Sequence, residues 1–332
     1  MTISENYFDT SRHSSFYLSC GPKEGPLLIF VHGWPELSFS WRHQLEFFGQ
    51  KGWHVIAPDM RGYGQSTVHS KHEDYSQSEI VKDMVELCGH LNQQEAVWIG
   101  HDWGSPVVWN MALHHPTMVT AVASLCVPLG FERGVEELIK YVDRDLYPME
   151  KYPKGQWDYQ YFYQENFDLA QEEMEVDPYK LVKALFRKRM GPDKDTPVFS
   201  ATIRERNGWF PPSGVPPDMP IDLDVLSEEE ARQYADSLSK TGFFGANSWY
   251  MNHERNRKFD DLLPAATSLD MPVLFCHAEH DYICYTLGTD LVLPMRERCS
   301  DLQETVIESG HWMAQEKPNE LNKALVGWLP KW

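Results

Sequence analysis

The sequence predicts an α/β protein in which a mostly parallel sheet, covered by helices on both faces, is interrupted by an inserted helical cap. Apolar strand-like runs alternate with amphipathic helical segments from about residue 26, and the same alternation resumes near residue 272. Between them, from about residue 130 to residue 255, the pattern predicts helical stretches and no buried strand. A chain of 332 residues is long enough for one large domain with such an insertion. We therefore expect residues 1–129 and 256–332 to form the core domain and residues 130–255 the cap domain.

The first half of the chain is expected to alternate strands with helices. The predicted strands are 26–32, 54–58, 96–99 and 119–127, and the predicted helices are 37–50, 77–91 and 104–115. Pro116 ends the last of these helices, because proline cannot continue one. The first 25 residues are expected to add a short antiparallel edge to the sheet.

The inserted block contains many aromatic residues and no buried strand pattern. Its stretch 207–220 is too rich in proline and glycine for regular structure. Ser227-Glu-Glu-Glu230 has the pattern of a capping box that opens a helix. Strands are expected again at 272–277 and 304–308, followed by a closing helix at 318–328. We expect the block to lie over the carboxyl edge of the strands, where open α/β sheets bind ligands.

Charge and cysteine content exclude several classes of protein. The formal net charge of −19 argues against binding to nucleic acid or to anionic membranes, since both require basic patches. The six cysteines are scattered without a C-x-x-C pair, which is typical of a reducing compartment. The amino terminus lacks the pattern of a signal peptide, and no apolar run reaches the length of a membrane span. We expect a cytoplasmic protein.

A sharp turn between the strand 96–99 and the next helix carries the most specific motif. Gly100 and Gly104 flank Asp102 at the spacing of the nucleophile elbow G-x-S-x-G of α/β hydrolases, with aspartate in place of serine. A carboxylate is suited to displacing a leaving group from saturated carbon, whereas a serine alkoxide attacks carbonyl carbon. The alternative is that Asp102 only caps the following helix.

Two further loops that follow predicted strands supply candidate partners for Asp102. Asp281 follows the strand 272–277 and His311 follows the strand 304–308, so that Asp102, Asp281 and His311 stand in the chain order nucleophile, acid, histidine. Glu279 competes with Asp281 for the role of the acid. A metal site made by His277, His280 and Asp281 is disfavoured, because no second ligand cluster has a recognised spacing.

The loop His32-Gly-Trp-Pro35 follows the first long strand. In α/β hydrolases this loop supplies one backbone N–H of the oxyanion hole, and the residue after the nucleophile supplies the other. The two donors would be the amides of Trp34 and Trp103. An ordinary glycine–proline turn is the alternative.

The chain resembles the soluble epoxide hydrolases of the α/β-hydrolase fold family over nearly its whole length. The resemblance rests on His32-Gly-Trp-Pro-Glu36 with Ser40-Trp-Arg42, Pro58–Gly64, Gly100-His-Asp-Trp-Gly104, the loops of Asp281 and His311, Asp158-Tyr-Gln160 with Gln164-Glu165, and Thr241-Gly-Phe243 with Trp249-Tyr250. It implies that Tyr159 and Tyr250 bind the epoxide oxygen. Residues 141–163 contain six tyrosines, so the residues themselves do not select Tyr159.

The resemblance implies conversion of an epoxide to a vicinal diol through an ester on Asp102, with His311 activating water and with no metal or organic cofactor. The expected partners are a small apolar epoxide and water, and Trp209, Phe210 and Trp312 are expected to line the substrate pocket. A haloalkane dehalogenase with the same aspartate is the first alternative, although Trp34 and the paired tyrosines disfavour it. A catalytically silent binding protein of the same fold is the second.

Overall fold

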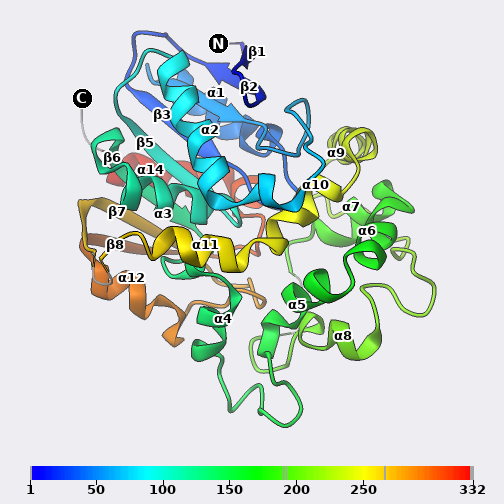
Figure 1. Cartoon of the computed structure of the whole chain (residues 1–332). Helices are drawn as coiled ribbons and strands as arrows, with labels where there is room; N and C mark the ends of the chain where they lie inside the picture. Colours follow the sequence, from blue (N-terminus) through cyan, green and yellow to red (C-terminus); the bar gives the residue numbers. More distant parts are fainter. Residues whose placement is uncertain (1, 190, 192, 265–266, 330–332) are drawn as a thin grey trace.

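The computed structural model describes residues 2–189, 191, 193–264 and 267–329, and it contains an eight-stranded sheet with helices on both faces (Figure 1). The strand order is β1-β2-β4-β3-β5-β6-β7-β8. The strands are β1 Ser4–Asp9, β2 Ser14–Cys20, β3 Leu27–Val31, β4 His54–Pro58, β5 Ala96–His101, β6 Val119–Leu125, β7 Leu269–Ala278 and β8 Cys299–Ile307. β2 pairs antiparallel with β1 and β4, and the other neighbours are parallel, which confirms both the predicted sheet and its antiparallel edge.

The sheet separates two hydrophobic cores because successive side chains of a strand point to opposite faces. In β3, Leu27, Ile29 and Val31 belong to one core, whereas Leu28 and Phe30 belong to the other. Helices α2 (Gln77–His90) and α3 (Gly104–His114) contribute to the first core. Helices α1 (Arg42–Gly49) and α14 (Pro318–Trp328) contribute to the second. Both faces of the parallel strands are therefore covered, as predicted.

Helices occupy the described part of the chain between β6 and β7, and none of these described residues forms a strand. They are α4 Val135–Leu138, α5 Asp158–Glu165, α6 Phe167–Glu175, α7 Pro178–Leu185, α8 Ile203–Arg206, α9 Glu228–Thr241, α10 Phe244–Ser248 and α11 His253–Asp260. Two short helices, α12 Leu293–Arg298 and α13 Met313–Glu316, flank β8. In Figure 1 the green and yellow inserted segments gather at one end of the strands, on the side opposite the amino terminus.

The predicted capping box is confirmed at the start of α9. The Ser227 side chain accepts a hydrogen bond from the N–H of Glu230, and the Glu230 carboxylate accepts one from the N–H of Ser227. The stretch 207–220 contains only turns, bends and irregular backbone, also as predicted.

Several element bounds differ from the prediction. β8 begins at Cys299, earlier than expected, because this edge strand is exposed or half-buried between its two buried ends and so lacks a continuous apolar run. β6 ends at Leu125, since Cys126 has a left-handed backbone with φ of 67° that leaves the strand. The helix expected at 37–50 is a 3₁₀ turn, Ser38–Trp41, followed by α1.

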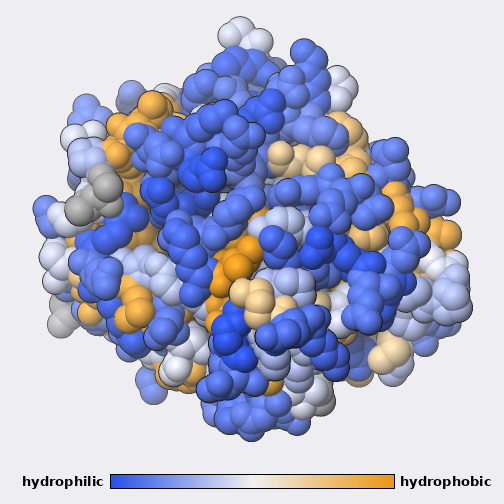
Figure 2. Space-filling view, turned by 60° about the horizontal axis from the view of Figure 1, so that its bottom comes forward, coloured by the Kyte–Doolittle hydropathy of each residue, from blue (hydrophilic) through white to orange (hydrophobic). Residues whose placement is uncertain are grey.

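The exterior is mostly hydrophilic on the face drawn in Figure 2, where hydrophobic residues form a small central strip and separate patches nearer the edges. Among the described residues, no helix combines the length and the apolar character that a membrane span requires. All six cysteines are buried and free.

Candidate active site

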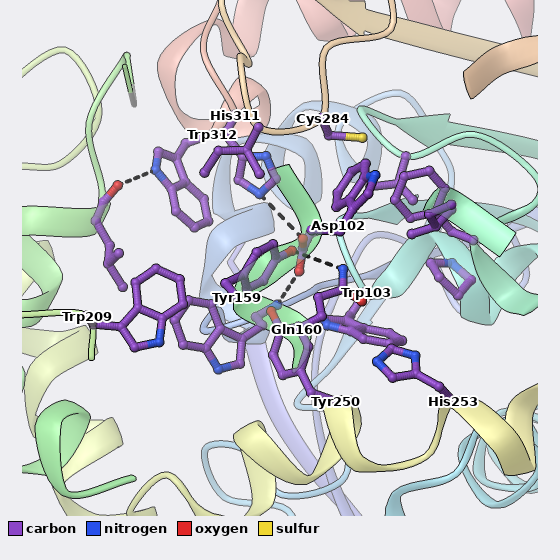
Figure 3. Close-up of a pocket in the computed structure, with 18 residues that line it drawn as sticks. Asp102, Trp103, Tyr159, Gln160, Trp209, Tyr250, His253, Cys284, His311 and Trp312 are labelled. Atoms are coloured by element: carbon purple, nitrogen blue, oxygen red, sulfur yellow. Dashed lines mark hydrogen bonds and ion pairs between the residues drawn. The ribbon is translucent and has the colours of Figure 1, made fainter. Parts of the chain in front are cut away.

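A cavity at the carboxyl edge of the parallel strands brings together most of the predicted site residues (Figure 3). The cavity has a volume of about 80 Å³. Tryptophan, tyrosine and aliphatic side chains make up most of its lining, and its described lining includes neither lysine nor arginine. Asp102 and His311 are the groups in it that carry charge. The cavity is therefore an apolar site with one carboxylate at its centre.

Asp102 lies at the turn between β5 and α3, in a left-handed backbone conformation with φ of 50°. This conformation is uncommon for a residue with a side chain, and it projects the carboxylate out of the turn. A Cβ on Gly100 would lie 2.5 Å from the carbonyl oxygen of Gly104, so the two glycines permit the tight packing of the elbow. α3 has no side-chain cap hydrogen bond, and its N-cap residue is Trp103. Asp102 therefore does not cap the helix.

The carboxylate of Asp102 accepts a hydrogen bond of 2.7 Å from the backbone N–H of Trp34. This loop comes close because Gly33 has no side chain. A Cβ there would lie 2.4 Å from Asp102 Oδ1 and 2.7 Å from the backbone nitrogen of Trp103. The Trp34 amide therefore bonds the Asp102 carboxylate directly, as one of the two expected oxyanion-hole donors would, and the backbone nitrogen of Trp103 borders the same side of Gly33.

His311 connects Asp102 to Asp281. Its Nδ1 lies 2.7 Å from Asp281 Oδ2, and its Nε2 lies 3.6 Å from Asp102 Oδ2. Asp281 is 3% exposed and also accepts a hydrogen bond from the N–H of Cys284. Glu279 is exposed, so Asp281 rather than Glu279 is the acid that contacts the histidine.

Opposite charges determine the protonation states of Asp102 and His311. Burial alone would lower the pKa of His311, but the charge of Asp281, its hydrogen bond to the ring and the nearby Asp102 carboxylate raise it well above its ordinary value. Burial would raise the pKa of Asp102, but His311, His101 and the Trp34 N–H together lower it. The aspartate is therefore ionised at neutral pH beside a protonated histidine.

Two tyrosines from the inserted helices face Asp102 from the side opposite His311 (Figure 3). Tyr159 belongs to α5, and Tyr250 belongs to the short 3₁₀ turn η8 (Trp249–Met251). Their ring centroids are 5.8 Å apart. Burial and, further, the charge of Asp102 raise the pKa of both phenols, so both are hydrogen-bond donors at neutral pH. Tyr163 is stacked on Tyr250 at 4.3 Å but does not line the cavity.

Three aromatic residues were expected in the substrate pocket. Trp209 and Trp312 line the cavity, whereas Phe210 does not. Glu173, which is 3% exposed, accepts hydrogen bonds from the backbone N–H groups of Trp209 at 2.7 Å and Phe210 at 3.3 Å. This contact orients the loop so that the Trp209 ring lies inward, while the half-buried Phe210 packs against the surrounding core.

Comparison with known proteins assigns the family. Residues 26–318 match the family model of the alpha/beta hydrolase fold. Epoxide hydrolase A of Mycobacterium tuberculosis is 30% identical over 98% of this chain and 97% of its own length. The crystal structure of epoxide hydrolase A from Mycobacterium thermoresistibile matches with a TM-score of 0.80 and 30% identity, covering 99% of this chain and 98% of that one. The chain is a member of the epoxide hydrolases.

Some relatives of this chain are longer than it is. The bifunctional epoxide hydrolase 2 of Sus scrofa is 34% identical over 92% of this chain but only 51% of its own length. The chain thus spans about half the length of these bifunctional relatives. A Vigna radiata epoxide hydrolase structure, 25% identical, covers 98% of both chains with a TM-score of 0.79.

The site is supported by a buried ion pair that the sequence did not single out. Glu36 accepts hydrogen bonds from the Gly33 N–H at 3.0 Å and from His101 Nδ1 at 2.7 Å. His101 Nε2 donates in turn to the carbonyl oxygen of His311, at 2.8 Å. Burial opposes protonation of His101, but the charge of Glu36 raises its pKa to about 10. Both residues lie within resembling segments, yet only the fold shows that they meet.

Two other polar features bear on the chemistry of the site. Gln160 Nε2 donates to the Tyr159 hydroxyl at 3.2 Å, which orients that phenol. His277, one residue of the disfavoured metal site, hydrogen-bonds Thr286 and Glu304. Among the described residues, His101, Cys126 and His311 form a group with metal-ligand atoms within 4.8 Å of one another, but the nitrogens of His101 already bond Glu36 and the His311 carbonyl.

Proposed function

We propose that this chain hydrolyses epoxides to vicinal diols in two steps, through an ester formed on Asp102. The observation that carries the proposal is the position of an ionised carboxylate between a histidine–aspartate pair and two protonated phenols, inside an apolar cavity. Each of these groups has a distinct part in the reaction.

In the first step, Asp102 Oδ attacks one ring carbon of the epoxide and the bond from that carbon to the ring oxygen breaks. The leaving oxygen would carry a strongly basic negative charge, so it needs acids positioned on it. Tyr159 and Tyr250 are on the side of Asp102 that a substrate would approach, and one of them gives its proton to the oxygen while the other donates a hydrogen bond. The product is a hydroxyalkyl ester of Asp102.

In the second step, water cleaves the ester at the carbonyl carbon of Asp102. Ester formation removes the negative charge of Asp102, which is one of the groups that raise the pKa of His311. His311 then gives up its proton, which through solvent restores the phenol deprotonated in the first step, and the neutral imidazole acts as a base on water, with Asp281 orienting its ring. The Trp34 and Trp103 amides stabilise the tetrahedral oxyanion on Asp102. The bond from the carbonyl carbon to the ester oxygen then breaks, and this oxygen takes the proton of the new carboxyl group, so that the diol leaves and the Asp102 carboxylate and the protonated His311 are restored.

The inserted segment supports the assignment of residues 130–255 as a cap domain over the site, because it contributes Tyr159, Tyr250 and Trp209 to the cavity. The aromatic lining fits a small apolar epoxide. We also propose a reducing, cytoplasmic location, which the six buried free cysteines support.

The dehalogenase alternative has less support from the site. A departing halide needs N–H donors and no proton, yet the Trp34 indole N–H is already bonded to Asn247 at 3.0 Å. The phenols of the two tyrosines supply protons that a halide does not use. The silent binding protein would require the loss of a catalytic group, and all the predicted ones are present in the cavity or adjoin it.

The covalent route can be tested by trapping. His311→Gln, treated with styrene oxide, is expected to accumulate an ester whose mass increment localises to the peptide that contains Asp102. His43→Gln, which changes a half-buried histidine outside the cavity, is the matched control and should show no adduct. Diol formation by the unmodified chain without any adduct in His311→Gln would contradict the covalent route. Turnover of chloroalkanes but not epoxides would favour the dehalogenase.

A further inference from the structure

One polar side chain of the cavity is not used by the proposed mechanism. His253, the first residue of α11, lines the cavity and is 3% exposed. Neither of its ring nitrogens has a hydrogen-bond partner among the described residues. A buried polar group without a partner costs free energy, so such groups are rare unless a ligand or water satisfies them. Since the ring adjoins the cavity, the missing partner would come from whatever occupies the cavity.

His253 and Trp209 lie on opposite sides of Asp102 (Figure 3), so His253 faces the part of a substrate that extends away from Trp209. The centroid of its ring is 6.0 Å from that of Trp103, the residue after the nucleophile. On its other side, a Cβ on Gly134 would lie 3.1 Å from the Cβ of His253, so the backbone there leaves little room for the ring to move.

A second unpartnered donor faces the same cavity. Trp157 is 1% exposed, and its indole nitrogen has no hydrogen-bond partner among the described residues. Its ring contacts Phe131 with 5.2 Å between centroids. Phe131 begins the 3₁₀ turn η4 (Phe131–Arg133), which packs against α11 and hence beside His253. This end of the cavity therefore offers an imidazole, which both donates and accepts, and an indole, which only donates.

The ligand group for this end should be neutral. Burial lowers the pKa of His253 to about 4, and the amino terminus of a helix further disfavours a positive charge. The imidazole is therefore uncharged at neutral pH and cannot balance an anion. The described lining contains no lysine or arginine, and the fixed charge of Asp102 would repel a carboxylate. A hydroxyl fits best, because it accepts one hydrogen bond and donates another.

We propose that His253 hydrogen-bonds a neutral, hydroxyl-bearing substituent of the epoxide substrate and so determines specificity. The inference rests on the proposed epoxide hydrolysis. The proposal narrows the substrate class from apolar epoxides in general to epoxides that carry a hydroxyl on the side of the epoxide ring that faces His253. A site built to bond a hydroxyl rejects the analogue without it, because the buried protein group is then left unpaired.

The test uses styrene oxides that differ in one group. The ethyl and hydroxymethyl derivatives, substituted at the meta or the para position, are nearly equal in size and differ in hydrogen bonding, and the para-carboxylate adds a charge. The measured quantity is the ratio of kcat/KM for the hydroxymethyl compound to that for the ethyl compound. At the ring position, meta or para, where the unmodified chain gives the higher ratio, His253→Leu is expected to lower this ratio at least fivefold. His253→Gln, which keeps a donor and an acceptor, should restore part of it.

His114→Leu is the matched control, since it removes a histidine that stacks on Phe259 outside the cavity and should leave the ratio unchanged. An unchanged ratio in a folded His253→Leu variant would overturn the inference, as would preference of the unmodified chain for the carboxylate. If His253→Leu does not fold, the substrate series on the unmodified chain decides, and equal kcat/KM for both compounds at both positions overturns the inference. Failure to hydrolyse any epoxide would instead overturn the proposed function.

Discussion

Substituting glutamine for Glu36 removes the negative partner of the buried Glu36–His101 ion pair. The variant tests whether this charge keeps His101 protonated and so stabilises the fold. Glu36 and His101 are each 1% exposed, and their side chains are 2.7 Å apart. In the variant, burial would favour the neutral form of His101, because the charge that keeps it protonated is gone. Removing one partner of a buried pair typically costs about 3–5 kcal/mol of the free energy of unfolding.

The pH dependence of the free energy of unfolding gives a second, independent value for the stabilisation by this ion pair. The pKa of His101 is raised from 6.5 to about 10 in the folded state, so the protonated histidine stabilises the fold fully below about pH 6.5, and this contribution is lost as pH rises through 10. Linkage across this shift corresponds to about 4 kcal/mol at pH 7 and less than about 1 kcal/mol at pH 10. The stability difference between the unmodified chain and Glu36→Gln should therefore shrink as pH rises.

Urea unfolding at pH 7, 8.5 and 10, with linear extrapolation to water, measures this difference directly. Glu46→Gln, an exposed glutamate on α1, is the control and should differ from the unmodified chain by no more than about 0.5 kcal/mol at each pH. The reasoning is refuted if Glu36→Gln loses the same stability at pH 7 and pH 10. A loss below about 1 kcal/mol at pH 7 would also refute it.

Three further substitutions test individual contacts. Replacing both Tyr159 and Tyr250 by phenylalanine should lower kcat/KM for epoxides by about a thousandfold or more, because no acid then protonates the leaving oxygen. A kcat/KM within about tenfold of that of the unmodified chain would show that other groups donate the proton. Asp281→Asn should lower kcat by about two orders of magnitude or more, whereas the exposed Glu279→Gln should change it less than about twofold; the opposite ranking would reassign the acid. Glu173→Ala should lower the free energy of unfolding, measured in urea, by about 2–4 kcal/mol, since two loop N–H groups lose their acceptor. An equal loss on replacing an exposed glutamate of the same helix by alanine would contradict this.

Local patterns predicted much of the fold and the identity of the central residue. The elbow around Asp102 was readable because a strand-to-helix turn needs glycine at fixed positions, and the structure has that turn with φ of 50° at the aspartate. The positions of Asp281 and His311 were predictable because parallel strands bring their carboxyl ends to one edge, and their side chains meet at 2.7 Å. The edge strand β8 was predicted too short, since its exposed face hides the apolar signal.

The inserted helices were less predictable than the sheet. Their amphipathic patterns indicate helices without saying which side chains reach the site, and the choice of Tyr159 among six tyrosines came from the family resemblance alone. Trp209 and Phe210 are adjacent in the chain, yet only Trp209 lines the cavity. A carboxylate on α6 decides this by holding both backbone N–H groups, and no local pattern encodes that contact.

What the sequence by itself determined is thus the alternation of the α/β core, the insertion, and a carboxylate nucleophile with its acid and histidine in chain order. The tertiary structure alone decided how these groups are charged and what surrounds them. Glu36 and His101 are 65 residues apart in the chain and meet at 2.7 Å, and the imidazole of His253 is left without a partner at the wall of the cavity. Burial and distance govern pKa and hydrogen bonding, and both exist only once distant segments have packed together.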